Sequence, residues 1–355
     1  MKIVRLRNPL ARRSGTPTRS RASLGLLALP LAAVLIGATG CSSDDSGDSG
    51  DSAKDAASTA SASAGAFPVS VDTKFGSITV KEQPERVVAL GWGDAETALA
   101  LGVQPVGESD WLAFGGDGVG PWAKGLYTKS PEKIGTMEPE YEKIAALKPD
   151  LILDTKSSGD QTRYDTLSKI APVIGVPKGG DQYKLSWEQQ TEMVSTALGK
   201  KAEGDKLIKG VEDKFAAAAK AHPEFKDKTV TLASKTSVGW GAYVSGTGRV
   251  DFVERLGFKN NPVIEKQAGD AFSVSVSEEN LDQFDADLLV LAPIGVTPAQ
   301  VTSDALYRKI PAVADGHAIV FDQDGLSQAF ATDSILSTSY AIDHVVPEFA
   351  KYVKK

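Results

Sequence analysis

The chain has one cysteine, Cys41, and three histidines among its 355 residues. A single cysteine excludes a disulfide within the chain. The histidines, His222, His317 and His344, lie far apart in the sequence, and two of them fall in patterns typical of helices. A zinc or manganese carrier needs histidines and carboxylates that converge on the ion. The sequence therefore disfavours a metal ion held by the protein itself.

Sequence motifs of common enzyme classes are also missing. No Gly-x-Ser-x-Gly elbow of a hydrolase is present, and the neighbours Asp343 and His344 both belong to a terminal helix pattern. There is no Gly-x-x-x-x-Gly-Lys phosphate loop, and the glycines of VSGTGR are typical of a turn. We expect no catalytic residues. An exported hydrolase and an adhesive surface lipoprotein are the alternatives from other classes.

Positive charge is scarce after the first forty residues. The whole chain has 39 basic and 46 acidic residues, and residues 1–40 contain seven of the basic ones and no acid. Without that segment 32 basic residues face 46 acidic ones, a formal charge of −14. Nucleic-acid binding depends on basic patches, so we expect no nucleic-acid partner.

The N-terminus has the pattern of an export signal. Its basic residues are followed by an apolar run, Leu24–Gly40, which is too short to be a dependable membrane span. Cys41 follows Ala-Thr-Gly, as in a bacterial lipobox, although Ala38 stands where leucine is more usual. Residues 42–66 are nearly all Ser, Ala, Asp and Gly, which cannot bury enough apolar surface to order a chain. We predict a signal peptide at 1–40, then a lipidated Cys41 with a disordered tether over 41–66.

The folded part begins near Phe67 with two predicted hairpin strands, FPVSVDT and GSITVKE. From Pro84 onward, short apolar strands such as VVAL and PDLIL alternate with helical patterns such as DAETALALG and YEKIAALK. This alternation is typical of a parallel sheet covered by helices, whose ligands lie beyond the carboxyl ends of the strands. After residue 222 the scheme repeats with TVTLAS, VDFVERLG, DLLVLAP and AIVFD, and a helix from about Asp333 to Lys351 closes the chain.

An apolar stripe with helical spacing runs from Trp187 to His222 and is interrupted at Gly199 and Gly204. We predict one long helix, bent at the glycines, of roughly 50 Å; two shorter helices with a turn at Gly199 are the alternative. Similar sequences flank this stretch. Glu142 begins EKIAALKPDLIL and Glu279 begins ENLDQFDADLLV, while RVVALGWGD and TVTLASKTSVGWG each contain Gly-Trp-Gly. We therefore expect two α/β lobes with parallel sheets, 67–186 and 223–355, joined by an interlobe helix over 187–222.

Four of the five tryptophans fall in predicted loops at strand ends rather than inside apolar runs. A tryptophan flanked by glycines has few neighbouring side chains to pack against, so the set is expected to form the wall of a ligand site. These four are Trp92, Trp111, Trp122 and Trp240.

The segments RVVALGWGDAETALALGVQPVG, EKIAALKPDLIL, VDFVERLGF, VSEENLDQFDADLLV and STSYAIDHVVPEF resemble the substrate-binding lipoproteins of bacterial ABC transporters for iron-siderophores. Vitamin B12 and haem binders belong to the same class. The resemblance extends from about Pro84 to Val353 and implies two Rossmann-like lobes bridged by one long helix. It further implies an exported monomer, lipid-anchored at the outer face of the cytoplasmic membrane, that delivers its ligand to an ABC permease.

The resemblance also implies roles for particular residues. One glutamate from each lobe docks onto arginines of the permease, and Glu142 and Glu279 match those positions. A ferric siderophore requires aromatic faces and Arg or Tyr donors, and because the siderophore coordinates the iron, no metal ligands or covalent cofactor are required of the protein. Haem or cobalamin is the alternative ligand, with Tyr243 or Tyr127 available to haem iron. The ligand-binding candidates are Trp92, Trp111, Trp122, Tyr127, Arg163, Trp240, Tyr243, Arg249 and Phe330.

Overall fold

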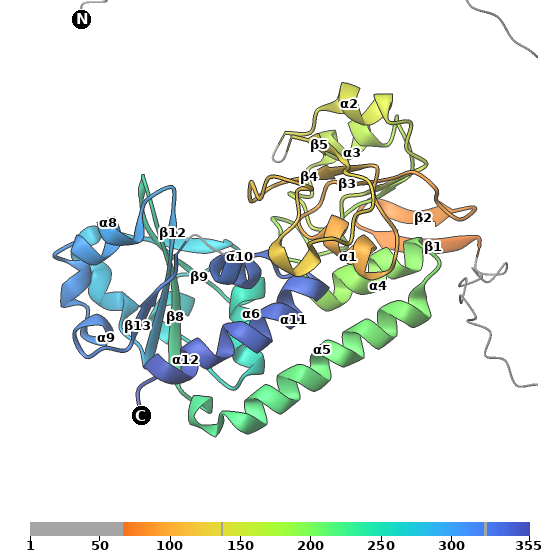
Figure 1. Ribbon diagram of the computed structural model, residues 1–355. Coiled ribbons are helices and arrows are strands. Elements are labelled where there is room, and N and C mark those ends of the chain that lie inside the picture. Colours follow the sequence, from red (N-terminus) through yellow and green to blue (C-terminus); the bar gives the residue numbers. More distant parts are fainter. Residues whose placement is uncertain (1–66, 136–137, 323–324) are drawn as a thin grey trace, which may run out of the picture. The chain divides into compact units, whose positions relative to one another are not determined.

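The computed structural model describes residues 67–135, 138–322 and 325–355 (Figure 1). The predicted signal peptide, Cys41 and the tether lie outside the described residues. The described residues all belong to one compact unit. Within them, none of the helices combines the length and the apolar character needed to cross a membrane.

The N-terminal lobe begins with the predicted hairpin, β1 (Val69–Thr73) antiparallel to β2 (Gly76–Val80). A five-stranded, wholly parallel sheet follows in the order β5-β4-β3-β6-β7. Its central strands are buried at every residue, as expected of a sheet covered on both faces. The strands are β3 (Val87–Ala89), β4 (Gly107–Ser109), β5 (Glu132–Ile134), β6 (Leu151–Leu153) and β7 (Val173–Ile174). The helices are α1 (Asp94–Ala100), η1 (Pro121–Ala123), α2 (Tyr141–Ala146) and α3 (Gln161–Leu167).

The predicted single helix over 187–222 is two helices, α4 (Trp187–Ala197) and α5 (Lys201–Ala221). Gly199 has a left-handed φ of 67°, and the amides of Gly199 and Lys200 donate to the Thr196 and Ser195 carbonyls at 3.0 and 2.7 Å. This pattern of hydrogen bonds ends an α-helix at a glycine. A Cβ on Gly204 would lie 2.3 Å from Ser195 Oγ, so glycine lets α5 pack closely against α4.

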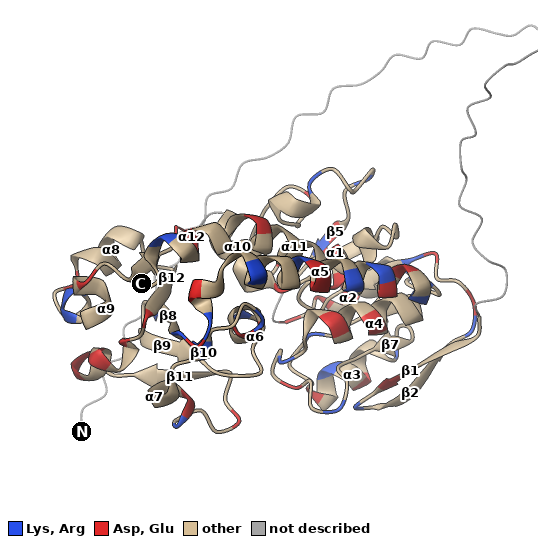
Figure 2. Cartoon of the chain, turned by 90° about the horizontal axis from the view of Figure 1, so that it is seen from below, with Lys and Arg blue, Asp and Glu red and all other residues tan. Residues whose placement is uncertain are grey.

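The long helix α5 joins the two lobes, as predicted for the fold class (Figure 1). Val211 and Phe215 of α5 pack into the core of the C-terminal lobe. On its exposed side, Lys201 pairs with Asp205 and Lys209 pairs with Asp213, and the two partners of each pair are four residues apart and 2.8 Å from one another. Figure 2 shows both signs of charge along this helix.

The C-terminal lobe has a mixed six-stranded sheet in the order β11-β9-β8-β12-β13, with β10 also paired to β8. β10, β12 and β13 extend it in parallel, whereas β9 and β11 are antiparallel additions at one edge. The second Gly-Trp-Gly therefore lies in a strand of a β-hairpin, unlike the first, which lies in a turn before α1. The strands are β8 (Thr229–Thr236), β9 (Gly239–Tyr243), β10 (Lys259–Asn260), β11 (Ser273–Val276), β12 (Leu288–Ile294) and β13 (Ala318–Val320).

Helices cover both faces of this sheet (Figure 1). The predicted closing helix is divided at Val345 into α11 and α12, with Pro347 in the first turn of α12. The helices are η2 (Pro223–Phe225), α6 (Gly248–Arg255), α7 (Pro262–Glu265), η3 (Glu278–Phe284), α8 (Pro298–Ser303), η4 (Tyr307–Lys309), α9 (Pro311–Ala314), α10 (Gly325–Thr332), α11 (Ile335–His344) and α12 (Val346–Tyr352).

Candidate ligand-binding site

A cavity of about 660 Å³ is lined by residues of both lobes. This volume is within the range of small-molecule sites, and the lining is mostly apolar and aromatic. Of the described lining residues, only Arg249 has a formal charge. From the N-terminal lobe come Trp92, Trp111, Leu112 and Ala113; from the C-terminal lobe come Tyr243, Arg249, Phe272, Ala292, Pro293, Ile294, Gly295, Ser327, Gln328 and Ala331.

Trp92 lies beyond the carboxyl end of β3, where the strand order reverses between β3 and β6. Such a switch point is where open parallel sheets bind ligands. The backbone of Trp92 is fixed on both sides: its amide donates to the Lys156 carbonyl at 2.9 Å, and its carbonyl accepts from Gln190 Nε2 at 2.8 Å.

A buried carboxylate, Asp94, organises this turn. It accepts hydrogen bonds from the Gly91 amide at 3.0 Å, the Thr155 amide at 3.0 Å, the Thr155 hydroxyl, and Gln190 Nε2 at 2.8 Å. Burial raises the pKa of the Asp94 carboxyl to about 6, although the bonds from Thr155 and Gln190 oppose the rise. The turn that presents Trp92 is therefore held by a network of hydrogen bonds rather than by apolar packing alone.

Trp92 is stacked between two other aromatic rings. Its centroid lies 4.1 Å from that of Trp111, with an interplanar angle of 7°, and 3.9 Å from that of Tyr183, at 20°. Tyr183 is not among the ligand-binding residues predicted from the sequence. Gln182 and Tyr183 both have left-handed φ values, 56° and 63°, and the Tyr183 amide donates to the Ser157 carbonyl at 2.9 Å. The only sequence signal was an aromatic residue following Gly179-Gly180 beyond a strand.

The opposite wall is built around Tyr243 and Arg249. Tyr243 ends β9, and the guanidinium carbon of Arg249, on the second residue of α6, lies 4.3 Å from the centroid of the Tyr243 ring. Phe272 meets the same ring edge-on at 5.7 Å. A cation held against an aromatic face can contact an anionic or oxygen-rich ligand without leaving the ring.

Of the nine predicted ligand-binding residues, the structure places Trp92, Trp111, Tyr243 and Arg249 at the cavity. Trp240, expected at the ligand wall, lies in the core with 3% exposure and is stacked on Tyr307 at 6.0 Å. The reason is the alternation of β9, because Trp240 and Ala242 face one side of the sheet and Tyr243 faces the other. The glycines on each side of Trp240 predicted that its ring would face a ligand. The pairing of β9 with its neighbouring strands instead places the Trp240 ring against partners in the core.

The other four candidates are also away from the lining. Phe330 points from α10 into the core against Phe252 and Phe349, and Tyr127 is buried in a small apolar cluster with Leu99. Trp122 packs against Phe114 and Tyr340. Arg163 forms a buried two-point contact with Asp154, at 2.6 and 3.0 Å. Each of the three aromatic side chains packs against at least one residue that is distant in the sequence, which a local pattern does not reveal, whereas the partner of Arg163 is nine residues away.

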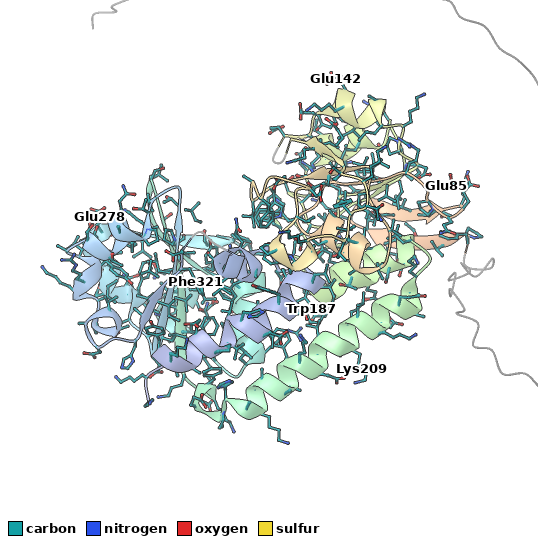
Figure 3. The ribbon with its side chains drawn as sticks, in the orientation of Figure 1. Glu85, Glu142, Trp187, Lys209, Glu278 and Phe321 are labelled. Atoms are coloured by element: carbon teal, nitrogen blue, oxygen red, sulfur yellow. The ribbon has the colours of Figure 1, made fainter. Side chains whose placement is uncertain are left out.

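Glu142 and Glu279 are both exposed, as their predicted role requires. Glu142 is in the first turn of α2, directly before β6, and Glu279 is in the first turn of η3, directly before β12. Figure 3 shows Glu142 on the N-terminal lobe and the neighbour of Glu279, Glu278, on the C-terminal lobe. The predicted helix-then-strand repeat is therefore present in both lobes.

A second, much smaller cavity of about 10 Å³ lies behind Trp111, with Glu96 and Glu108 in its lining. Glu108 is 1% exposed. Burial, and after it the charges of Asp110 and Glu96, raise the pKa of Glu108 to about 9, while Lys133 opposes the rise. The wall that carries Trp111 is thus built over a carboxyl that is neutral at pH 7.

We expect Glu108→Gln to remove a pH dependence of stability. The folded chain binds the Glu108 proton more tightly than the unfolded chain, whose pKa is near 4.5, so folding takes up a proton between pH 4.5 and about 9. The free energy of unfolding of the wild type therefore falls as pH rises through this window, by about 1.4 kcal/mol per pH unit. Thermal unfolding at several pH values should show a flatter profile for the variant. Parallel profiles for the two proteins would contradict this account of Glu108.

None of the residues in 67–135, 138–322 and 325–355 form a group of three or more His, Cys, Asp or Glu side chains that could hold a metal ion. His222 pairs with Glu224 at 2.9 Å, the His317 ring nitrogen lies 3.0 Å from the Tyr352 carbonyl, and His344 packs on Tyr340. Asp343 accepts from Lys214 at 2.5 Å across the surface.

Two α/β lobes joined by a long helix, with a ligand-sized cavity lined by both, define a substrate-binding protein. The chain belongs to the periplasmic binding protein family, whose model matches residues 87–324. The resemblance seen in the sequence is thereby confirmed. Proteins of this family bind substrates rather than transform them.

Relatives and solved structures agree with this assignment. The probable siderophore-binding lipoprotein YfiY of Bacillus subtilis is 27% identical over 291 residues, covering 78% of this chain and 85% of that protein. The Fe(3+)-citrate-binding protein YfmC of the same species is 28% identical over 255 residues, covering 70% and 76%. PiaA of Streptococcus pneumoniae, solved in complex with ferrichrome, has a TM-score of 0.69 and 29% identity over 81% of this chain and 100% of PiaA.

Proposed function

We propose that this chain is a lipid-anchored, monomeric solute-binding protein that captures a ferric siderophore, of hydroxamate type, and delivers it to an ABC permease. The observation that carries the proposal is the cavity itself. Stacked indole rings form one wall, and a tyrosine with an arginine against its face forms the other. Such walls suit an organic ligand whose metal is already wrapped in oxygen atoms.

The charge and size of the cavity support the same class of ligand. Arg249 can donate to iron-bound oxygens, and a guanidinium makes its strongest contacts with anionic or strongly polar oxygens. The hydroxamate class is favoured by the likeness to PiaA, which was solved with ferrichrome. Export, the lipid on Cys41 and the position at the outer face of the cytoplasmic membrane rest on the sequence and on relatives that are named lipoproteins.

We expect ferric siderophores to quench the tryptophan fluorescence of the purified protein. Trp92 and Trp111 line the cavity, so a coloured ferric complex bound there lies directly against two of the five indoles. A panel of ferric hydroxamates, catecholates and carboxylates, with haem and cobalamin alongside, should give saturable quenching with at least one hydroxamate. Flat titrations with all three siderophore classes would overturn the proposal, and saturation by haem or cobalamin alone would reassign the ligand.

A further inference from the structure

One loop of the C-terminal lobe is held by two buried side chains of the N-terminal lobe. The loop is Asp333–Ser334, between α10 and α11. Lys156 Nζ, beyond the end of β6, lies 2.7 Å from Asp333 Oδ2 and donates to the Asp333 carbonyl at 3.0 Å. Glu96, on α1, accepts a hydrogen bond from the Ser334 hydroxyl. These four residues, Glu96, Lys156, Asp333 and Ser334, are called the latch below.

The latch is shielded from water. The side chains of Lys156 and Asp333 are 4% and 7% exposed, so their attraction is screened far less than that of a surface pair. Removing one member leaves the other charge buried without its counter-ion, which is costly. The pair therefore ties the two lobes together with a directional contact, unlike apolar surfaces, which can slide past one another.

On the N-terminal side the latch is continuous with the cavity wall formed by Trp92 and Trp111, called the indole wall below. The carbonyl of Lys156 accepts the hydrogen bond from the Trp92 amide at 2.9 Å. The amide of the preceding residue, Thr155, donates a hydrogen bond to the Asp94 carboxylate at 3.0 Å. The same carboxylate accepts a hydrogen bond from the Gly91 amide. A shift of Lys156 toward or away from Asp333 is thus transmitted through one backbone hydrogen bond to Trp92.

On the other side the latch is continuous with the cavity wall formed by Tyr243 and Arg249, called the arginine wall below. A Cβ on Gly248 would lie 2.2 Å from Asp333 Oδ2, so the first residue of α6 packs directly on the Asp333 carboxylate. The next residue is Arg249. Asp333 also directly follows α10, which supplies Ser327, Gln328 and Ala331 to the cavity lining.

Asp333 has a left-handed φ of 51°, an unusual conformation for a residue with a side chain. Lys156 contacts both the carbonyl and the carboxylate of Asp333, and Gly248 of α6 packs against the same carboxylate. The backbone geometry and the ion pair are therefore features of the same contact, which fixes where α10 ends and α11 begins.

We propose that Lys156 and Asp333 are positioning residues for ligand binding, setting the distance between the indole wall and the arginine wall. Neither of them is among the residues that line the cavity. The proposal rests on the proposed function for its ligand readout, but the spacing of the two lobes can be measured without any ligand.

The test uses the full chain with Cys41→Ser and two spin labels on exposed residues, one in each lobe, at Lys169→Cys and Ser303→Cys. Lys156→Met and Asp333→Asn are compared with the parent protein by the distance distribution between the labels and by the affinity for a ferric hydroxamate that binds the parent. Ile144→Ala is the control, because it truncates a fully buried side chain in the core of the N-terminal lobe that belongs neither to the latch nor to the cavity lining.

We expect both latch variants to broaden or shift the distance distribution and to weaken affinity at least tenfold at a temperature where each remains folded. Ile144→Ala should lower the Tm while leaving the distance distribution unchanged and affinity within about twofold. Unchanged distances in a folded Lys156→Met or Asp333→Asn protein would overturn the proposal. If Lys156→Met does not fold, Asp333→Asn, which keeps the side-chain shape, decides. If no ferric complex binds the parent, the proposed function fails and the distances alone decide the latch.

Discussion

Replacing Glu142 and Glu279 together by alanine is expected to abolish uptake of the ferric complex by cells while leaving its affinity for the purified protein unchanged. Both carboxylates are exposed, and neither is among the residues that line the cavity. A carboxylate on each lobe can form charge-assisted contacts with arginines of a permease, and losing both removes the two anchors that orient the protein. Transport of a radiolabelled ferric siderophore, with binding measured separately by fluorescence, checks the expectation.

A matched control is the double substitution Glu82→Ala with Asp315→Ala. Both acids are exposed, and one lies in each lobe. Their replacement removes the same amount of charge from other parts of the surface. Uptake should survive in this control. Weaker ligand binding by the Glu142 and Glu279 variant, or undiminished uptake, would show that the docking role is wrong.

Trp92→Ala is expected to weaken binding of the ferric siderophore by roughly 30-fold or more, corresponding to about 2 kcal/mol, as for a central aromatic residue in a binding site. Trp92 lies at the switch point of the sheet, between the rings of Trp111 and Tyr183. Its removal deletes one wall of the cavity and releases both neighbours from the stack. Isothermal titration with the same ferric complex measures the loss.

Trp240→Phe provides the control for Trp92→Ala, because Trp240 is an equally large ring in the core of the C-terminal lobe. This change should lower the Tm and leave affinity within about twofold. Equal losses of affinity in the two variants would indicate a general effect of destabilisation. Unchanged affinity in the Trp92→Ala protein would show that the indole wall does not contribute to ligand binding.

The lobes and their repeat could be predicted because they depend on local signals. Short apolar strands following amphipathic helices indicate α/β units wherever they occur, and EKIAALKPDLIL and ENLDQFDADLLV gave this signal twice. The sequence indicated a turn at Gly199 as an alternative to one long helix, but it could not decide between the two. A glycine can bend, end or simply occupy a helix, and the outcome depended on the packing of α5 against Ser195 at Gly204.

The cavity was harder to predict because its walls depend on contacts between distant residues. Trp92 and Trp240 have the same glycine neighbours, yet Trp92 stacks in the turn beyond the carboxyl end of β3 and Trp240 is buried, since only Trp240 lies within a hydrogen-bonded strand. Tyr183 joins the stack through two left-handed residues in a loop, a conformation without a sequence signal for non-glycine residues. Lys156 and Asp333 are 177 residues apart, and no pattern in the sequence indicated that they form an ion pair.

The most direct measurement is the position of iron in crystals grown with a ferric hydroxamate, located from its anomalous scattering. We expect a single strong peak inside the cavity, between Trp92 and the Tyr243–Arg249 wall, with every coordinating atom supplied by the siderophore. A peak elsewhere on the chain, or iron bonded directly to a protein side chain, would contradict the account.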